Sequence, residues 1–252
     1  MKLLVSVVDA QEAVEALKGG ADIIDVKNPE EGSLGAAPPW VIHDVIKAVA
    51  GLRETSCTLG DLPALPGSIS LAATGAGLQG PDFIKVAAKD LASPSDAVKV
   101  LSWTVRALDK LHPTPKVIAC TYADWEQASA LSPLQLVDAA ARSHAFGVLL
   151  DTYNKHGRSL FDIMKPLEVK AFVQAARRHG LLCAIAGSLT LTQAPAIRFC
   201  NPDIVGIRGA ACESGDRTTG RVSSKCVRLF REAIAQQFEC RPSIHLPARG
   251  SL

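Results

Sequence analysis

The chain has 252 residues, of which 48% are hydrophobic and 21% are charged, and its formal net charge is +2. A chain of this size and composition can bury a complete core and fits one large globular domain or two small ones. Lysine and arginine are scattered among acidic residues rather than grouped in runs. The sequence therefore lacks the electrostatic pattern of a protein that binds nucleic acid or an anionic membrane, and it favours small-molecule partners.

Short apolar runs recur along the chain, and each is followed by turn residues and then by Ala, Leu and Val at helical spacing. Asp9 is the expected N-cap of the first helix, and Gly19 and Gly20 are its expected end. The strands are predicted at residues 3–8, 22–27, 55–60, 82–87, 117–122, 147–152, 182–187 and 203–208. The helices are predicted at residues 9–20, 38–51, 68–80, 93–111, 132–146, 165–180, 192–200 and 223–238.

This alternation predicts an α/β fold, a single-domain (β/α)8 TIM barrel. Eight strand–helix units suit such a barrel better than a doubly wound sheet, in which about six strands are usual. The strands are apolar on both faces, as a parallel sheet covered by helices requires. No Pro-rich or Ser-rich linker divides the chain. We therefore expect residues 1–238 to form the catalytic barrel, and the C-terminal tail 239–252, which lacks helical periodicity, to be loosely ordered.

The seven cysteines are odd in number, include no C-x-x-C pair, and in several cases lie inside apolar runs. They predict buried free thiols in a reducing compartment. The apolar run at the N-terminus is too short for a signal peptide, and no stretch is long and apolar enough to cross a membrane. We therefore expect a cytoplasmic protein.

Active sites of (β/α)8 barrels lie at the carboxyl ends of the strands. Because side chains in a strand alternate with a period of two, residues 25 and 27 should point to the same side, which would place a carboxylate beside an ammonium group. Charged residues at the predicted strand ends, or in the loop that follows, include Asp25, Lys27, Lys85, Asp151 and Lys155.

A lysine inside an apolar barrel is suited to imine formation with a carbonyl substrate. Burial and a second nearby cation both lower the pKa of such an amine and free its lone pair. Lys27, with Lys85 and Lys155 nearby, fits this arrangement, and Asp25 and Asp151 could then shuttle protons.

A structural explanation competes with the catalytic one at each of these positions. A lysine at a strand end commonly extends to water, and an aspartate there commonly caps the next helix. We favour the capping role for Asp61 and Asp124, which follow the third and fifth strands. We favour the catalytic role for the lysines, because two apolar strands carry one in the same way.

The loops after the seventh and eighth strands, "AGSLT" and "IRGAACESGDRTTGR", offer Gly-rich backbone donors, with further arginines nearby. Barrels often bind a substrate phosphate at this place, although plain turn chemistry would give the same residues. The candidate phosphate-binding residues are Gly187, Ser188, Arg208 and Gly209.

Other site classes have little support in the sequence. The histidines show no metal-ligand spacing, so we expect no metal. No nucleophile elbow and no nucleotide-binding glycine motif is found, so we expect neither nucleophilic hydrolysis nor a cofactor.

The segments "DIIDVKNPEEGSLGA", "PGSISLAATGAGLQGPDFIKV", "LLDTYNKHGRSLFD", "CAIAGSL" and "DIVGIRGAACESGDRTTGR" resemble the (5-formylfuran-3-yl)methyl phosphate synthase family, and the likeness runs from about residue 1 to residue 230. The resemblance implies a lyase that condenses two molecules of glyceraldehyde 3-phosphate into a furan aldehyde phosphate for the biosynthesis of methanofuran-type cofactors. It places the Schiff-base lysine on Lys27, the proton-accepting lysine on Lys85, and further functional charges on Asp25, Asp151 and Lys155.

Two alternatives stay open at this point. Another class I aldolase acting on triose or sugar phosphates would use the same lysines. A non-catalytic sugar-phosphate-binding regulator would bind phosphate without turnover. The expected partners are small-molecule triose phosphates, with no nucleic acid and no membrane, and with homo-oligomer formation left open.

Overall fold

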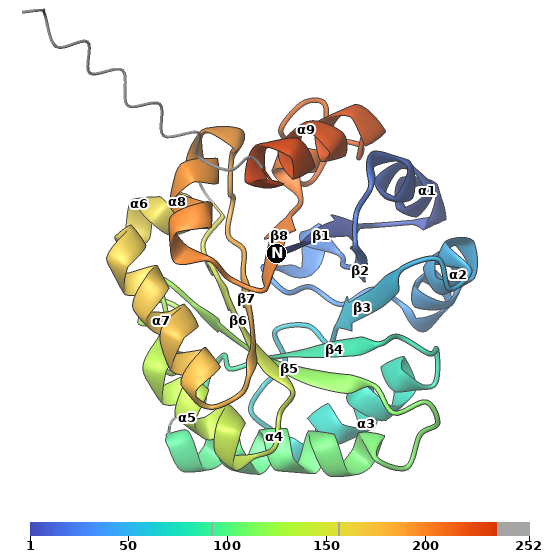
Figure 1. The fold of residues 1–252 in the computed structure, drawn as a ribbon. Coiled ribbons are helices and arrows are strands. Elements are labelled where there is room, and N and C mark those ends of the chain that lie inside the picture. The colour runs from blue at the N-terminus through green and yellow to red at the C-terminus, as the bar shows by residue number, and fades with distance from the viewer. Residues whose placement is uncertain (92, 156, 236–252) are drawn as a thin grey trace, which may run out of the picture.

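The computed structural model describes residues 1–91, 93–155 and 157–235. Within them, eight parallel strands pair in chain order and close into a barrel (Figure 1). The predicted single-domain TIM barrel is thereby confirmed, whereas the predicted tail 239–252 lies outside the described residues. The strands are β1 (Lys2–Val7), β2 (Ile23–Val26), β3 (Glu54–Thr58), β4 (Phe83–Ala87), β5 (Lys116–Tyr122), β6 (Gly147–Asp151), β7 (Leu182–Ile185) and β8 (Ile204–Ile207).

Helices surround this barrel, and α1 and α9 lie side by side where the first and last units meet (Figure 1). The α-helices are α1 (Ala10–Gly19), α2 (Pro39–Val49), α3 (Pro66–Gly77), α4 (Pro94–Leu108), α5 (Pro133–Arg142), α6 (Leu160–Ile163), α7 (Pro166–Arg178), α8 (Ala194–Cys200) and α9 (Ser224–Ala235). Three 3-10 helices are η1 (Pro29–Glu31), η2 (Leu191–Gln193) and η3 (Gly209–Ala211). Of the α-helices, the sequence pattern missed α6, because a single turn has too few residues to show a period.

Local signals set the helix boundaries. Asp9 accepts a hydrogen bond from the backbone N–H of Glu12 at 2.8 Å, and Gly20 ends α1 in the left-handed conformation with φ of 89°, as the sequence predicted. Five other α-helices of the described ranges begin with proline, whose fixed φ suits the first helical position and whose missing N–H would have had no partner there. The loops that carry the candidate site are therefore held between well-defined strand and helix ends.

Side chains alternate between the two faces of each strand, which gives one apolar layer between strands and helices and another inside the barrel. In β2, Ile24 and Val26 belong to the core shared with the helices, while Ile23 belongs to the cluster inside the barrel. The positions that follow Ile23 on its side are Asp25 and Lys27. Both are buried, which confirms that the two side chains share the inner side of the strand.

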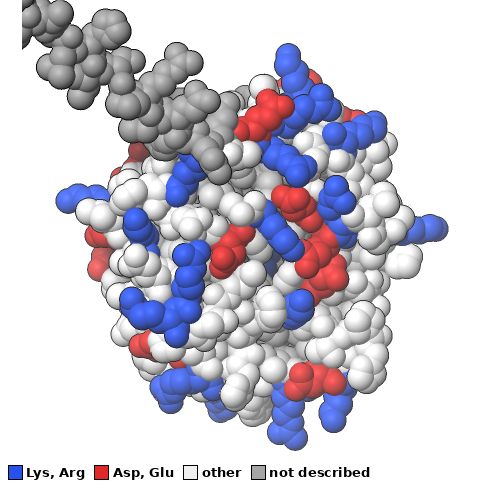
Figure 2. Space-filling view, in the orientation of Figure 1, with Lys and Arg blue, Asp and Glu red and all other residues white. Residues whose placement is uncertain are grey.

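Lys, Arg, Asp and Glu are interspersed on the face drawn in Figure 2. The described cysteines are all free, and five of these six are buried, as the sequence predicted; Cys240 lies outside the described residues. No helix in the described ranges combines the length and the hydropathy that a membrane span requires.

Candidate active site

A cavity of about 1290 Å³ opens among the strands and the loops that follow them. Its inner wall is apolar and includes Ile23, Ile118 and Leu149. Its polar wall includes Lys27, Lys85, Asp151 and Lys155, together with the candidate phosphate loops after β7 and β8. The cavity therefore joins the lysines and the loops that the sequence assigned to one site.

Asp25 and Lys85 form an ion pair inside the barrel, with 2.7 Å between Lys85 Nζ and Asp25 Oδ2. Asp25 is completely buried, and it also accepts hydrogen bonds from Ser6 Oγ at 2.7 Å and from Ser56 Oγ at 2.5 Å. Strand register explains this cluster, because Ser6, Asp25 and Ser56 are partners across β1, β2 and β3. The carboxylate thus accepts three hydrogen bonds and does not line the cavity, so it positions Lys85.

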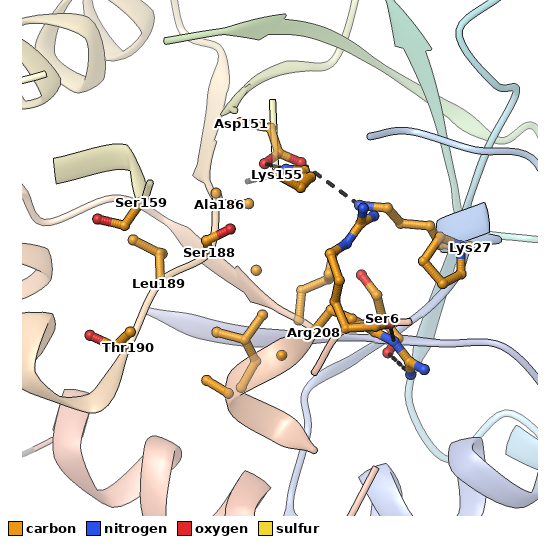
Figure 3. A pocket seen from close by; sticks show the side chains of 18 of the residues that line it. Ser6, Lys27, Asp151, Lys155, Ser159, Ala186, Ser188, Leu189, Thr190 and Arg208 are labelled. Atoms are coloured by element: carbon orange, nitrogen blue, oxygen red, sulfur yellow. Dashed lines mark hydrogen bonds and ion pairs between the residues drawn. The ribbon is translucent and has the colours of Figure 1, made fainter. Parts of the chain in front are cut away.

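Asp151 is shared by two lysines (Figure 3). Lys155 Nζ donates to its Oδ1 at 2.5 Å, and Lys27 Nζ lies 3.8 Å from its Oδ2 on the other side. The backbone N–H of Thr152 also donates to Oδ1, at 2.7 Å. Lys155 holds the closer contact, so Lys27 is the less tightly bound of the two ammonium groups.

Burial lowers the pKa of Lys27 to about 7; attraction by Asp151 opposes this effect, and repulsion from Lys155 and Lys85 adds to it. The pKa of Lys155 is also lowered, chiefly by burial. Burial would raise the pKa of Asp151, but the two neighbouring ammonium groups outweigh it and lower that pKa to about 2. Near neutral pH, Lys27 is thus partly in its neutral amine form beside an ionised carboxylate.

Two details of the expected site are wrong. Asp25 forms its ion pair with Lys85 and not with Lys27, because the closed barrel brings β4 close to β2 while Lys27 reaches toward β6. The pKa of Lys85 is raised and not lowered. Burial alone would lower it, but the attraction of Asp25 and its hydrogen bond outweigh the burial.

The loop after β7 presents backbone N–H groups to the cavity. Gly187 and Ser188 line the cavity with φ of 111° and 48°, and neither N–H donates to another group within the described ranges. A Cβ at position 187 would lie 2.8 Å from Thr152 Cγ2, so the loop can approach β6 only with glycine there. Consecutive N–H groups in such a turn form a concave site suited to an anion.

Arg208 differs from its expected role. Its guanidinium forms a buried ion pair with Glu12, with Nη2 3.3 Å from Oε1. It also donates Nη1 to the Ser6 carbonyl at 3.1 Å (Figure 3). Its other donors reach the carbonyl oxygens of Arg217 at 2.9 Å and Gly220 at 3.2 Å. All five N–H groups are therefore engaged, and in this arrangement none is left for a phosphate. The side chain holds the loop after β8 in place.

Asp61 and Asp124 have structural roles, although neither caps a helix as expected. Asp61 accepts a hydrogen bond from the buried Tyr122 hydroxyl. Asp124 accepts from the backbone N–H of Tyr153 at 2.7 Å and of Asn154 at 2.9 Å, and so fixes the loop that carries Lys155.

Sequence reasoning did not select Ser6, Ser56 or Glu12, and it counted Arg217 only among the arginines near the candidate phosphate loops. Polar residues at inward positions of neighbouring strands would have identified the two serines. Within the described ranges, no group of three or more His, Cys, Asp or Glu is arranged to hold a metal ion.

Sequence comparison gives consistent matches. A family model described as 4-HFC-P synthase matches residues 3–231. The (5-formylfuran-3-yl)methyl phosphate synthase of Methanopyrus kandleri is 43% identical over 234 residues, which cover 93% of this chain and 99% of the relative. The protein of the same name from Methanothermobacter thermautotrophicus is 45% identical, again over 234 residues, 93% of this chain and 99% of the relative.

Solved structures with similar folds are more distant in sequence. A 3-hexulose-6-phosphate synthase has a TM-score of 0.64 at 18% identity, covering 93% of this chain and 100% of that chain. A phosphoribosyl anthranilate isomerase from Thermus thermophilus has a TM-score of 0.61 at 14% identity, covering 93% of this chain and 98% of that chain. At these identities the likeness shows the barrel fold alone.

Proposed function

The chain belongs to the 4-HFC-P synthase family, and on that premise we propose that it condenses two molecules of glyceraldehyde 3-phosphate into (5-formylfuran-3-yl)methyl phosphate. The reaction releases one phosphate and two waters, and its product would serve the biosynthesis of a methanofuran-type cofactor. The reaction class is a lyase that works through an imine on Lys27.

The observation that carries this proposal is the state of Lys27. Its side chain lines the cavity, its pKa lies at about 7, and Lys155 competes with it for Asp151. A protein that only binds sugar phosphates would gain more from fully charged lysines. A buried amine that is partly neutral near pH 7 is the form that attacks a carbonyl carbon.

In the first step, Lys27 Nζ attacks the aldehyde carbon of one triose phosphate to give a carbinolamine. Loss of the hydroxyl as water needs a proton, which the ammonium groups of Lys155 and Lys85 are placed to supply. The resulting iminium withdraws electrons from the neighbouring carbon. A proton leaves that carbon, and the Asp151–Lys155 pair accepts it, since the pKa of Lys155 is lowered.

The enamine then attacks the aldehyde carbon of the second triose phosphate, which forms the new carbon–carbon bond. Ring closure, dehydration and elimination of one phosphate produce the furan, and hydrolysis of the imine frees Lys27. Lys85 supplies a positive charge and a proton in this scheme, not a base, because Asp25 holds its pKa high.

Two phosphorylated substrates need two anion sites. The backbone N–H groups of Gly187 and Ser188, together with the loop that begins at Gly209, are suited to one of them. Arg208, anchored by Glu12, holds the loop after β8 in position. A class I aldolase would use the same amine, but no feature of the site favours it over the synthase.

The test is incubation with glyceraldehyde 3-phosphate and borohydride, followed by peptide mass spectrometry, with furan absorbance measured in parallel without reductant. We expect a triose-derived mass on Lys27 and formation of the furan. Lys27→Arg should abolish both, whereas Lys99→Arg, which alters an exposed lysine of α4, should retain both.

Trapping without furan formation would support an aldolase instead. The absence of both signals from the unaltered protein would refute the proposed synthase.

A further inference from the structure

We propose that Arg217 is a substrate-binding residue that holds the phosphate of the triose attached to Lys27. This inference rests on the proposed function and adds a phosphate site distinct from the backbone donors after β7. Arg217 lies in the loop after β8, far from Lys27 along the chain. The closed barrel brings both side chains to the same cavity.

The contacts of Arg217 leave most of its donors available. Its side chain is partly buried and lines the cavity, and Nη2 donates to the carbonyl oxygen of Gly32 at 3.1 Å. Within the described ranges, this is its one hydrogen bond from the side chain, and it forms no ion pair. A guanidinium has five N–H groups, so four form no hydrogen bond within the described ranges, while the bond to Gly32 holds one end of the group in place.

The charges around Arg217 favour an anion. Asp151 attracts Lys27, Lys155 and Arg217, while Asp25 is paired with Lys85. Asp216 also attracts Arg217, and Asp124 also attracts Lys155, but both act after Asp151 in strength. Burial is the largest cause of the lowered pKa of both lysines, and the positive charge of Arg217 lowers both pKa values further. An arginine stays charged at any physiological pH, so its positive charge needs an anionic partner when substrate excludes water.

The ligand that fits is a phosphate close to the imine. Arg217 is near enough to Lys27 and Lys155 for its charge to lower the pKa of both amines. A triose phosphate has its phosphate two carbons from the aldehyde, so imine formation at Lys27 places the phosphate within this cluster of cations. Arginine binds phosphate oxygens through two parallel hydrogen bonds, which fixes orientation as well as affinity.

Buried contacts of Arg208 hold the backbone of Arg217 in place. Arg208 Nε donates to the carbonyl oxygen of Arg217 at 2.9 Å, and Glu12 holds the other end of Arg208. Gly209 lets this loop fold back, because a Cβ there would lie 2.8 Å from the carbonyl oxygen of Gly215. The sequence thus uses one arginine to position the loop and the other to face the cavity.

The experiment tests two aldehydes on each of three proteins: the unaltered protein, Arg217→Gln and Arg217→Lys. Borohydride trapping on Lys27 is measured with glyceraldehyde 3-phosphate and with glyceraldehyde, which has no phosphate. Binding of inorganic phosphate is measured by calorimetry on the same proteins. Arg231→Gln is the matched control, because Arg231 also donates to a glycine carbonyl, that of Gly20, but lies outside the cavity.

We expect Arg217→Gln to reduce trapping of glyceraldehyde 3-phosphate about tenfold or more, the effect of losing a charge-assisted contact, and to leave trapping of glyceraldehyde within about twofold. Arg217→Lys should recover part of the loss. Equal losses with both aldehydes, or no loss with either, would overturn the proposal. If the unaltered protein forms no adduct at all, the proposed imine on Lys27 is refuted, and the phosphate site is judged from the affinity for inorganic phosphate alone. A loss of affinity confined to the Arg217 variants supports the phosphate site. Equal affinity in all proteins refutes it.

Discussion

Asp151→Asn should make Lys27 easier to deprotonate. The substitution keeps the shape of the side chain but removes the negative charge that lies 3.8 Å from Lys27 Nζ. At an effective dielectric constant of about 20, two unit charges at that distance attract by about 4 kcal/mol, which corresponds to about three pKa units and is an upper limit. Lys155 already takes part of this attraction, so we expect the pKa of Lys27 to fall from about 7 by about one unit or more.

The assay is the rate of acetylation of Lys27 as a function of pH, followed by peptide mass spectrometry, with the exposed Lys225 as the internal reference. This readout does not depend on turnover. Lys155→Gln should shift the profile in the opposite direction, to higher pH, because it removes a repelling cation and frees Asp151 for Lys27. A purely structural role of Asp151 would lower accessibility without moving the midpoint. An alkaline shift in Asp151→Asn, or a midpoint above about pH 9 in the unaltered protein, would refute the electrostatic argument.

Asp25→Asn should reduce the free energy of unfolding by about 3 kcal/mol, because Lys85 stays buried without its carboxylate. Adding Lys85→Met should restore part of this stability. Urea unfolding of the unaltered protein and the two variants measures both effects, and a double variant as unstable as Asp25→Asn would contradict the argument. Lys27→Met should raise the melting temperature at pH 7. A lysine whose pKa is lowered by folding destabilises the fold most below its folded pKa of about 7, and this penalty disappears toward the ordinary value of 10.5. The difference in melting temperature should therefore narrow between pH 7 and pH 10, and a constant difference would argue against the lowered pKa.

Much of the barrel could be predicted from the sequence because two periodic patterns alternate along it. The period of two in the strands was sufficient to place Asp25 and Lys27 on one side of the chain, and the rule that barrel sites lie at strand ends selected Lys85, Asp151 and Lys155. These predictions need only the local chain and the closure of the sheet.

The pairing of charges was not predictable in the same way, because it depends on distances across the barrel. Asp25 is two residues from Lys27 in the chain, yet its partner is Lys85 on β4. The position of Arg208 at the end of β8 suggested a ligand contact, and nothing in the local sequence indicated that Glu12 in α1 would engage its guanidinium. Residues far apart in the sequence decide such contacts, and their geometry follows from the register and the loops.

The arrangement of charges favours Lys27, among the three lysines of the cavity, as the nucleophile of the proposed reaction. The buried Lys27 and Lys85 and the partly buried Lys155 share two carboxylates, and hydrogen-bond geometry divides the carboxylates unequally among them. Asp25 has two serine donors and binds Lys85 directly, so that ammonium group is stabilised. Asp151 binds Lys155 at 2.5 Å and leaves Lys27 at 3.8 Å. The proton that is easiest to remove therefore belongs to Lys27. An added carboxylate near Lys27 would stabilise its ammonium form and reduce the reactivity of the amine.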